Sequence, residues 1–297
     1  MGSTKLRGRA LSEALWGYAM IGPTILLLVI FSYVALGASL GISFTDWHVL
    51  LPPHWVGLTN YINIFQDPLF LKGLWNTARY VLMSIPIGQS LALILALILN
   101  TNIRFRNFFR LVYFLPVLTM PVAIAVVWKW IYNPAFGPIA IFLQTVGLKP
   151  IIWLTNVKMA MWSIVFISVW AGIGYNMVIM LAGLQNIPRE YYEAAEVDGA
   201  SSLAKIFNIT LPLLTPTLFF TLITSFINGL QMFDMVYVLT QGGPIDSTRT
   251  IVFQVYEDGV KSLYAGTSSA EAWVLFIIIM VITLVQFRIQ RKWVYYE

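Results

Sequence analysis

Six apolar stretches, each long enough to cross a lipid bilayer, constrain this chain most. A helix needs about 20 mostly apolar residues to span the hydrocarbon core. The stretches lie at about 16–40, 76–99, 108–131, 160–184, 212–234 and 268–288. Because 59% of the 297 residues are hydrophobic and only 10% are charged, a soluble fold could not cover its surface. We therefore predict an all-α integral membrane protein with one membrane domain, residues 1–297.

The distribution of basic residues predicts how this domain is oriented. Cytoplasmic loops carry an excess of Lys and Arg. If the N-terminus is cytoplasmic, 11 of the 18 basic residues fall on inner segments. These residues are Lys5, Arg7, Arg9, Arg104, Arg106, Arg110, Arg189, Lys205, Arg288, Arg291 and Lys292. Six spans then place both termini in the cytoplasm, and the net charge of +5 reflects topology and not a nucleic-acid partner.

The first stretch follows Lys5, Arg7 and Arg9, as the apolar part of a signal peptide would. Its length exceeds the roughly 7–15 apolar residues of a signal sequence. Because five further spans follow, we interpret it as a signal anchor that remains as the first span.

The spans lack the groups that membrane enzymes and ion-coupled transporters use. Carboxylates and histidines within spans usually mark such functions, and here Asp234 and Arg79 stand only at span ends. His48 and His54 share the first outer loop, where a metal pair is an alternative to two solvated side chains. The chain has no Cys and no phosphate-binding G-x-x-x-x-G-K-[ST] loop. We expect no enzyme activity, metal or bound cofactor. If the protein moves a solute uphill, the energy must come from another subunit.

The inner segment 185–211 is the most informative part of the sequence. Pro188 suits a first helical turn, and Gly199 can adopt the left-handed conformation that ends a helix. Ser201 is a good cap for a second helix, which runs to about Ile209, and Pro212 then opens the fifth span. A lipid-anchoring surface helix is the alternative. The first helix is rich in acidic residues, and anionic lipid would repel it, so a protein partner is the better interpretation.

The same segment resembles the EAA loop of permease subunits in binding-protein-dependent ABC importers, whose pattern is EAA-x3-G-x9-I-x-L-P. The matching residues are Glu193, Ala194, Ala195, Gly199, Ile209, Leu211 and Pro212. Segments 47–61, 133–137, 185–188 and 238–244 are similar to the carbohydrate-uptake subgroup, of the maltose and multiple-sugar permease type. The resemblance covers nearly the whole chain.

This resemblance implies a six-span type I ABC importer permease in a bacterial or archaeal cytoplasmic membrane. Its expected partners are a second permease, forming a heterodimer, two copies of a cytoplasmic ATPase that holds ATP and Mg, and an external solute-binding protein. The loop would dock on the ATPase as a coupling helix. The implied coupling residues are Glu193, Ala194, Ala195, Asp198, Gly199, Ile209, Leu211 and Pro212.

Polar and small residues in spans four and five suggest a path for the solute. Ser225, Asn228, Gly229 and Met232 lie at offsets of three, four and seven, so they share one helix face. Helix–helix packing is an equally good interpretation of the same residues. Similarity to maltodextrin permeases implies that Val117, Pro121, Gly172, Ser225, Gly229 and Met232 contact the solute. Tyr175, Asn176, Asn228 and Gln231 complete the candidate set.

The sequence thus predicts the permease subunit of an ATP-driven sugar importer. Import of glycerol 3-phosphate or a related polyol is one alternative, but a phosphate would require cationic groups near the pathway, and the spans carry cations only at their ends. A membrane enzyme or a sensor is the alternative from another class. It would need catalytic groups within the membrane, or a signalling domain, and no inner segment exceeds about 30 residues.

Overall fold

The computed structural model describes residues 3–101 and 103–295, with side chains from residue 13 onward. Within this part of the chain every regular element is a helix, and the only β contacts are two isolated bridges, Thr45 to Trp55 and His48 to Tyr264. The predicted all-α class is therefore confirmed.

Five helices are long and apolar enough to cross a membrane, and one bent pair makes a sixth span. The first consists of α1 (Ser3–Leu28), a π-helical turn (Val29–Val34) and α2 (Ala35–Ile42). The others are α4 (Pro68–Asn100), α8 (Ala160–Gln185), the continuous segment Ser202–Leu230 and α14 (Ala265–Gln290). These match five of the six predicted spans in position.

The third predicted span, 108–131, corresponds to a bent pair of helices and not to one straight helix. α5 (Arg106–Phe114) continues as a 3₁₀ turn (Leu115–Leu118), and α6 (Pro121–Ile131) then departs at an angle of 100°. Pro116 and Pro121 each lack a backbone N–H, and Pro121 occupies the first turn of α6. Because Thr119 and Met120 adopt extended backbone between them, the helix breaks there.

Two other helix ends differ from the prediction. α4 begins at Pro68 and not at residue 76, because Asp67 caps it by accepting a hydrogen bond from the Leu69 N–H at 2.9 Å. α11 (Leu211–Leu230) ends four residues before the predicted end at 234. The chain turns over 231–233 and enters α12 (Asp234–Leu239).

Short helices complete the chain at the loops. They are α3 (Thr59–Gln66), α7 (Pro138–Thr145), α9 (Arg189–Val197), α10 (Ser202–Lys205) and α13 (Ile251–Tyr256), which runs into a π-helical turn (Glu257–Lys261). A further π-helical segment (Ile206–Thr210) joins α10 to α11.

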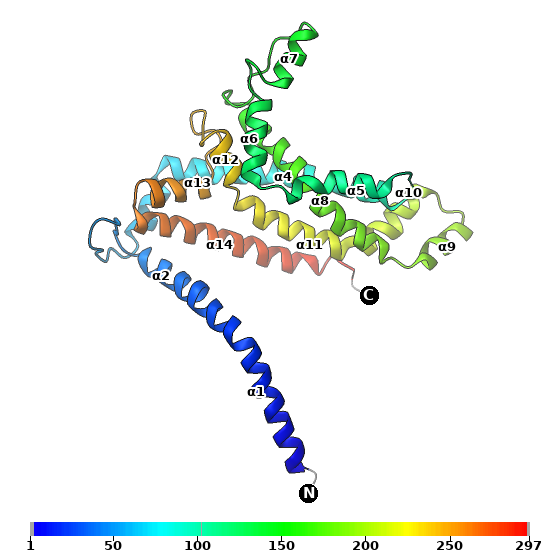
Figure 1. Ribbon diagram of the computed structural model, residues 1–297, viewed down its shortest axis with the longest axis horizontal. Coiled ribbons are helices and arrows are strands. Elements are labelled where there is room, and N and C mark those ends of the chain that lie inside the picture. The colour runs from blue at the N-terminus through cyan, green and yellow to red at the C-terminus, as the bar shows by residue number, and fades with distance from the viewer. Residues whose placement is uncertain (1–2, 102, 296–297) are drawn as a thin grey trace.

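Figure 1 shows how these elements are arranged. α4, α8, α11 and α14 run side by side as an elongated body, with α9 and α10 at one end and α2 at the other. α1 leaves the body beyond α2, and its apolar window has no buried residue. On the opposite side, α6 and α7 project away from the body. The C-terminal segment lies near the end that carries α9, where the Tyr295 N–H donates to Thr215 Oγ1 of α11 at 3.0 Å.

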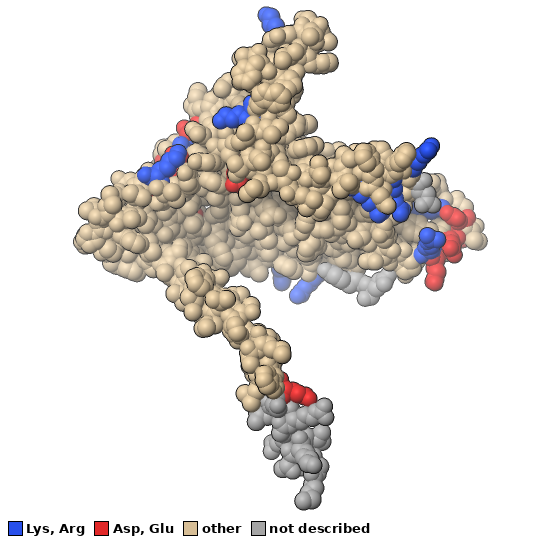
Figure 2. All heavy atoms as spheres, in the orientation of Figure 1, with Lys and Arg blue, Asp and Glu red and all other residues tan. Residues whose placement is uncertain are grey.

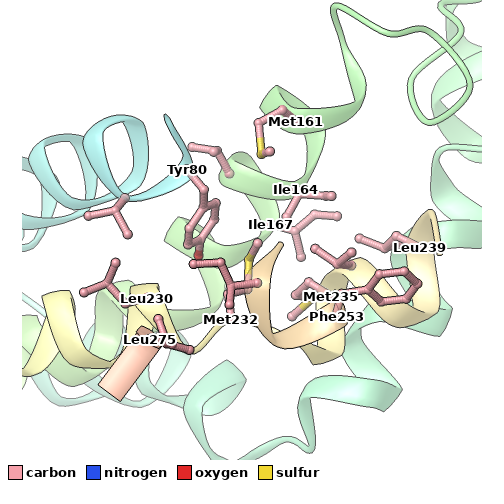
Figure 3. Packing of buried hydrophobic residues seen from close by; sticks show 14 of the residues in the cluster. Tyr80, Met161, Ile164, Ile167, Leu230, Met232, Met235, Leu239, Phe253 and Leu275 are labelled. Atoms are coloured by element: carbon pink, nitrogen blue, oxygen red, sulfur yellow. The ribbon is translucent and has the colours of Figure 1, made fainter. Parts of the chain in front are cut away.

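The core lies where α4, α8, α11, α12, α13 and α14 meet. Figure 3 shows Met161, Ile164 and Ile167 of α8 beside Tyr80 of α4 and Met232 after α11. The three α8 residues have no exposed surface. A second cluster joins α4, α8 and α11 nearer the coupling loop. Because α8 contributes to both clusters, it is the central helix of the body.

The close packing of α8 against α5 can be tested by substituting a glycine at their contact. A Cβ added at Gly174 would lie 2.1 Å from the Tyr113 carbonyl oxygen, whereas a Cβ at Gly172 would meet nothing within 4 Å. We expect Gly174→Ala to lower the stability of the purified protein by about 1–3 kcal/mol, the usual effect of overpacking. The melting temperature measures this change. Gly172→Ala on the same helix is the matched control and should not lower it, and equal effects of the two variants would contradict this packing.

Candidate functional site

A cavity of about 470 Å³ lies between α4, α8 and α11 and extends to the start of α12. Nine of the ten predicted pathway residues line it. Val117, in the 3₁₀ turn after α5, is not among its lining residues. The nine residues are Pro121, Gly172, Tyr175, Asn176, Ser225, Asn228, Gly229, Gln231 and Met232.

Sequence reasoning missed the wall that α4 contributes. Tyr80, Ser84 and Gly88 recur every four residues and so share the face of α4 that lines the cavity, with Gln89 beside them. Ser168 of α8 also lies on the lining. The signal was present in the sequence, because Ser84 and Gln89 are polar residues in the middle of a predicted span.

Hydrogen bonds tie the three walls together. Gln89 Nε2 donates to the Thr221 carbonyl oxygen and to Ser225 Oγ, both at 2.9 Å. Asn176 Nδ2 donates to the same Ser225 Oγ at 3.3 Å. Ser225 and Asn176 therefore line the cavity and also join α8 to α11, which combines the two interpretations that the sequence left open.

The polar groups around this cavity are almost all uncharged. Among the lining residues, Asp234 is the only one with a formal charge. Amide and hydroxyl groups supply donors and acceptors, and Tyr175 is 42% exposed beside the open space at Gly172. A surface that combines aromatic faces with neutral hydrogen-bonding groups suits a neutral solute with many hydroxyl groups.

The predicted coupling loop forms a helix with a tight, glycine-dependent end. Gly199 has φ of +74°, which favours glycine. Its N–H donates to the Glu196 carbonyl oxygen at 3.0 Å, and the Ala200 N–H donates to the Ala195 carbonyl oxygen at 2.9 Å. These two bonds define a Schellman motif, as the position of Gly199 predicted. Ser201 caps α10 by accepting from the Ala204 N–H at 3.3 Å.

The motif residues divide into an exposed group and a packed group. Glu193, Ala194, Asp198 and Gly199 are exposed and Ala195 is half-buried, whereas Ile209, Leu211 and Pro212 are half-buried at the base of α11. Figure 2 shows acidic and basic side chains together around α9 and α10 at this end of the body. The exposed group is therefore accessible to a partner.

Two side-chain contacts hold α9 in place. Lys205 Nζ lies 2.7 Å from Glu196 Oε1, and this hydrogen bond lowers the pKa of the Glu196 carboxyl. The Tyr192 hydroxyl lies 3.0 Å from Thr210 Oγ1, at the base of α11. The loop is thus fixed to the helix that lines the cavity.

The second helix of the loop, predicted to end at about Ile209, is continuous with the fifth span, which was predicted to open at Pro212. The segment from Ser202 to Leu230 is continuous. The π-helical turn Ile206–Thr210 joins α10 to α11, and Pro212 is the second residue of α11, in the first turn, where a proline is tolerated. A displacement of α10 would therefore move the helix that carries Ser225.

The two histidines of the first outer loop lie in different surroundings. The His48 ring packs against Tyr264, with centroids 4.9 Å apart, and His54 Nδ1 lies 3.5 Å from Asp46 Oδ2. Among the residues that the structure describes, no group of three or more His, Asp or Glu side chains could hold a metal ion.

The fold, the cavity and the loop together define a helical membrane permease. Residues 84–294 match the family described as binding-protein-dependent transport system inner membrane component, and the chain belongs to that family. It is a membrane component of an ABC importer, and it crosses the membrane several times.

Similar proteins agree with this assignment. The probable ABC transporter permease protein YesP of Bacillus subtilis (strain 168) is 37% identical over 96% of this chain and 93% of that protein. The sn-glycerol-3-phosphate transport system permease protein UgpA of Shigella flexneri is 32% identical over 94% and 95%. A bacterial alginate ABC transporter, solved with its alginate pentasaccharide-bound periplasmic protein, contains a chain with the same fold. Its TM-score is 0.85 at 23% identity, covering 96% of each chain.

We expect the hydrogen bond between Tyr192 and Thr210 to hold α9 against the base of α11. Tyr192→Phe removes a hydrogen bond worth about 1 kcal/mol, so we expect amide exchange in 189–198 to accelerate roughly fivefold. Hydrogen–deuterium exchange of the purified protein measures this rate. Tyr191→Phe, at an exposed neighbouring tyrosine, is the matched control and should leave exchange unchanged. Unchanged exchange in Tyr192→Phe would contradict a fixing role for this bond.

Proposed function

We propose that this chain is one of two permeases in an ATP-driven importer of a neutral sugar or oligosaccharide. The observation that carries this proposal is the cavity between α4, α8 and α11, where amide, hydroxyl and aromatic groups are combined with no cationic side chain. Sugar hydroxyl groups both donate and accept hydrogen bonds, which this lining can satisfy without a fixed charge.

A second permease would close the other side of the pathway. On the cavity wall, a Cβ added at Gly172 would meet no atom within 4 Å, and Tyr175 is exposed. Gly37 and Gly41 lie one turn apart on α2, and a Cβ at either would meet nothing within 4 Å. Small residues of this kind allow close helix contact in membranes. The uncovered first span and the projecting α6 and α7 supply further surface for this partner, which in our proposal is a different chain.

A pair of cytoplasmic ATPase subunits would drive the cycle through the exposed side of α9. Glu193 can pair with a cation of the ATPase, Ala194 permits close approach, and Gly199 sets the turn. Because Ser202–Leu230 is continuous, motion of the loop would reach Ser225, about 35 Å along the helix. ATP and Mg would be bound by those subunits and not by this chain.

The remaining parts of the proposal concern delivery and location. A solute-binding protein would deliver the sugar to the loops at the end of the body opposite α9. We place the chain in the cytoplasmic membrane of a bacterium or archaeon, and the charge distribution supports an orientation with both termini inside. Import of glycerol 3-phosphate is the second candidate, since relatives carry that name. The lining disfavours it, because Asp234 would repel the phosphate.

The coupling role is tested by charge reversal and by loss of the turn. We expect Glu193→Lys or Gly199→Pro to abolish sugar uptake while the variant still reaches the membrane, because the loop could no longer engage the ATPase. Copurification of the ATPase and uptake into proteoliposomes measure the effect. Glu257→Lys, on the opposite end of the body, should retain the ATPase. If both loop variants take up sugar at the wild-type rate, the loop does not couple transport to the ATPase.

The substrate class is tested by uptake of radiolabelled solutes into proteoliposomes that contain the whole importer and its binding protein. We use D-glucose, maltose, sucrose, raffinose and glycerol 3-phosphate, and expect uptake of at least one sugar and none of the phosphate. Ser225→Ala and Asn228→Ala should each reduce sugar uptake severalfold, since each removes about 1 kcal/mol of hydrogen bonding. If neither variant changes uptake, the assignment of Ser225 and Asn228 to the solute site is wrong. Uptake of glycerol 3-phosphate alone would show that the substrate is a phosphate ester and not a neutral sugar.

A further inference from the structure

The start of α5 and the segment before it place two arginines on an open recess and a third behind it. The recess has a volume of about 570 Å³, and Arg104 and Arg106 are among its lining residues. Arg110 follows four residues after Arg106 on α5, so the two side chains share a helix face, with Cβ atoms roughly 5–6 Å apart. Figure 2 shows basic side chains over α5, with acidic side chains farther out around α9.

These arginines lack a counter-charge in the part of the chain that the structure describes. The Arg104 guanidinium lies over the Phe105 ring, 5.2 Å from its centroid. Neither Arg106 nor Arg110 forms an ion pair with a described residue. Two like charges one turn apart on a helix repel each other, so an anion from outside this chain would stabilise them.

The two members of this pair differ in what they can offer an anion. Arg110 Nε and Nη2 are buried and have no hydrogen-bond partner among the described residues. Because these atoms are out of reach, Arg110 adds positive potential behind the recess and not a direct contact. Arg106 is half-buried on the lining, so it is the side chain that a bound anion would touch.

The backbone adds to this positive potential. Phe105 adopts φ of +64° directly before α5, and its side chain does not cap the helix. The first N–H groups of a helix carry a partial positive charge that an anion stabilises. Because Arg106 is the first residue of α5, its side chain and the helix end favour an anion at the same place.

The surroundings of the recess indicate that this anion belongs to a lipid. α5 begins the third span near the end of the body that carries α9 and α10, so the recess lies at the level of the lipid headgroups (Figure 1). Phe105 and Phe108 line the recess and are 66% and 60% exposed. Exposed aromatic side chains beside arginines suit a ligand that combines a phosphate with acyl chains, and not an anion dissolved in water.

We propose that the start of α5 binds the phosphate group of an anionic phospholipid. Arg106 donates to the phosphate oxygens, for which the fork of a guanidinium is well suited, and Arg104 and Arg110 supply further positive charge. The acyl chains lie against Phe105 and Phe108. The site is separate from the cavity, so this inference does not depend on the solute that the importer carries.

Hydrogen–deuterium exchange of the whole importer in lipid nanodiscs tests this site. The probe is dioleoylphosphatidylglycerol, mixed in increasing proportion into nanodiscs of dioleoylphosphatidylcholine. We expect amide exchange in 103–109 to slow as the fraction of phosphatidylglycerol rises. Arg106→Gln should raise the fraction needed for half-maximal protection about fivefold, which is the usual contribution of one basic side chain near anionic lipid.

Arg288→Gln is the matched control for this experiment. It removes the same charge from an exposed position in the last turn of α14, outside the recess, and should leave the half-maximal fraction unchanged. Melting temperatures in pure phosphatidylcholine should agree between the wild type and Arg106→Gln. If Arg106→Gln is less stable there, Arg104→Gln, at an exposed position before the helix, decides in its place and should give the same increase.

Several results would overturn the proposal. If phosphatidylglycerol does not slow exchange in 103–109, or if Arg288→Gln has the same effect as Arg106→Gln, this segment holds no specific lipid site. Equal protection by millimolar inorganic phosphate in pure phosphatidylcholine would assign the site to a soluble anion. If Arg106→Gln loses the ATPase while its response to phosphatidylglycerol is unchanged, the arginines contact the ATPase and not a lipid.

Discussion

In the hydrocarbon core every backbone N–H and C=O group needs a partner within the protein, and the rest of this structure depends on that constraint. It explains why the described chain is helical throughout its spans. It also explains where the helices are allowed to break. The bend between α5 and α6 includes Pro121, and α11 ends just before Gln231 and Met232; all three of these residues line the cavity. Irregular backbone at membrane depth is tolerated where it is buried in protein or faces a cavity, and here it helps to form one.

The same constraint accounts for the polar network around Ser225. A lone amide within a span would be costly against lipid, so Gln89 and Asn176 are bound to α11. Asn176 lines the cavity, but its Oδ1 atom is buried and has no hydrogen-bond partner among the described residues. The network therefore stabilises the contact of α4, α8 and α11 beside the cavity.

The loop at the other end of the body is connected to this network by a single helix. α9 is held to the base of α11 by Tyr192, and α10 continues into α11 through a π-helical segment. A helix is stiff over this length, so force on α9 is transmitted without a joint at Pro212. The exposed residues Glu193 and Gly199 precede this helix, and α9 contacts its base through Tyr192 and Thr210.

The sequence by itself determined the features that depend on short-range physics. Apolar length located the spans, and the Gly199 turn and the Ser201 cap followed from local backbone preferences. The spacing of Ser225, Asn228 and Gly229 placed them on one face of α11 beside the cavity, and Met232 lines the cavity from beyond the end of that helix. Only the tertiary structure decided which helices face each other. The approach of α4 to α11, which pairs Gln89 with residues 132 and 136 positions away, leaves no trace in local pattern. The 100° bend likewise required the packing around Pro121, because a proline within a span is compatible with a kink, a break or a straight helix until its neighbours are placed.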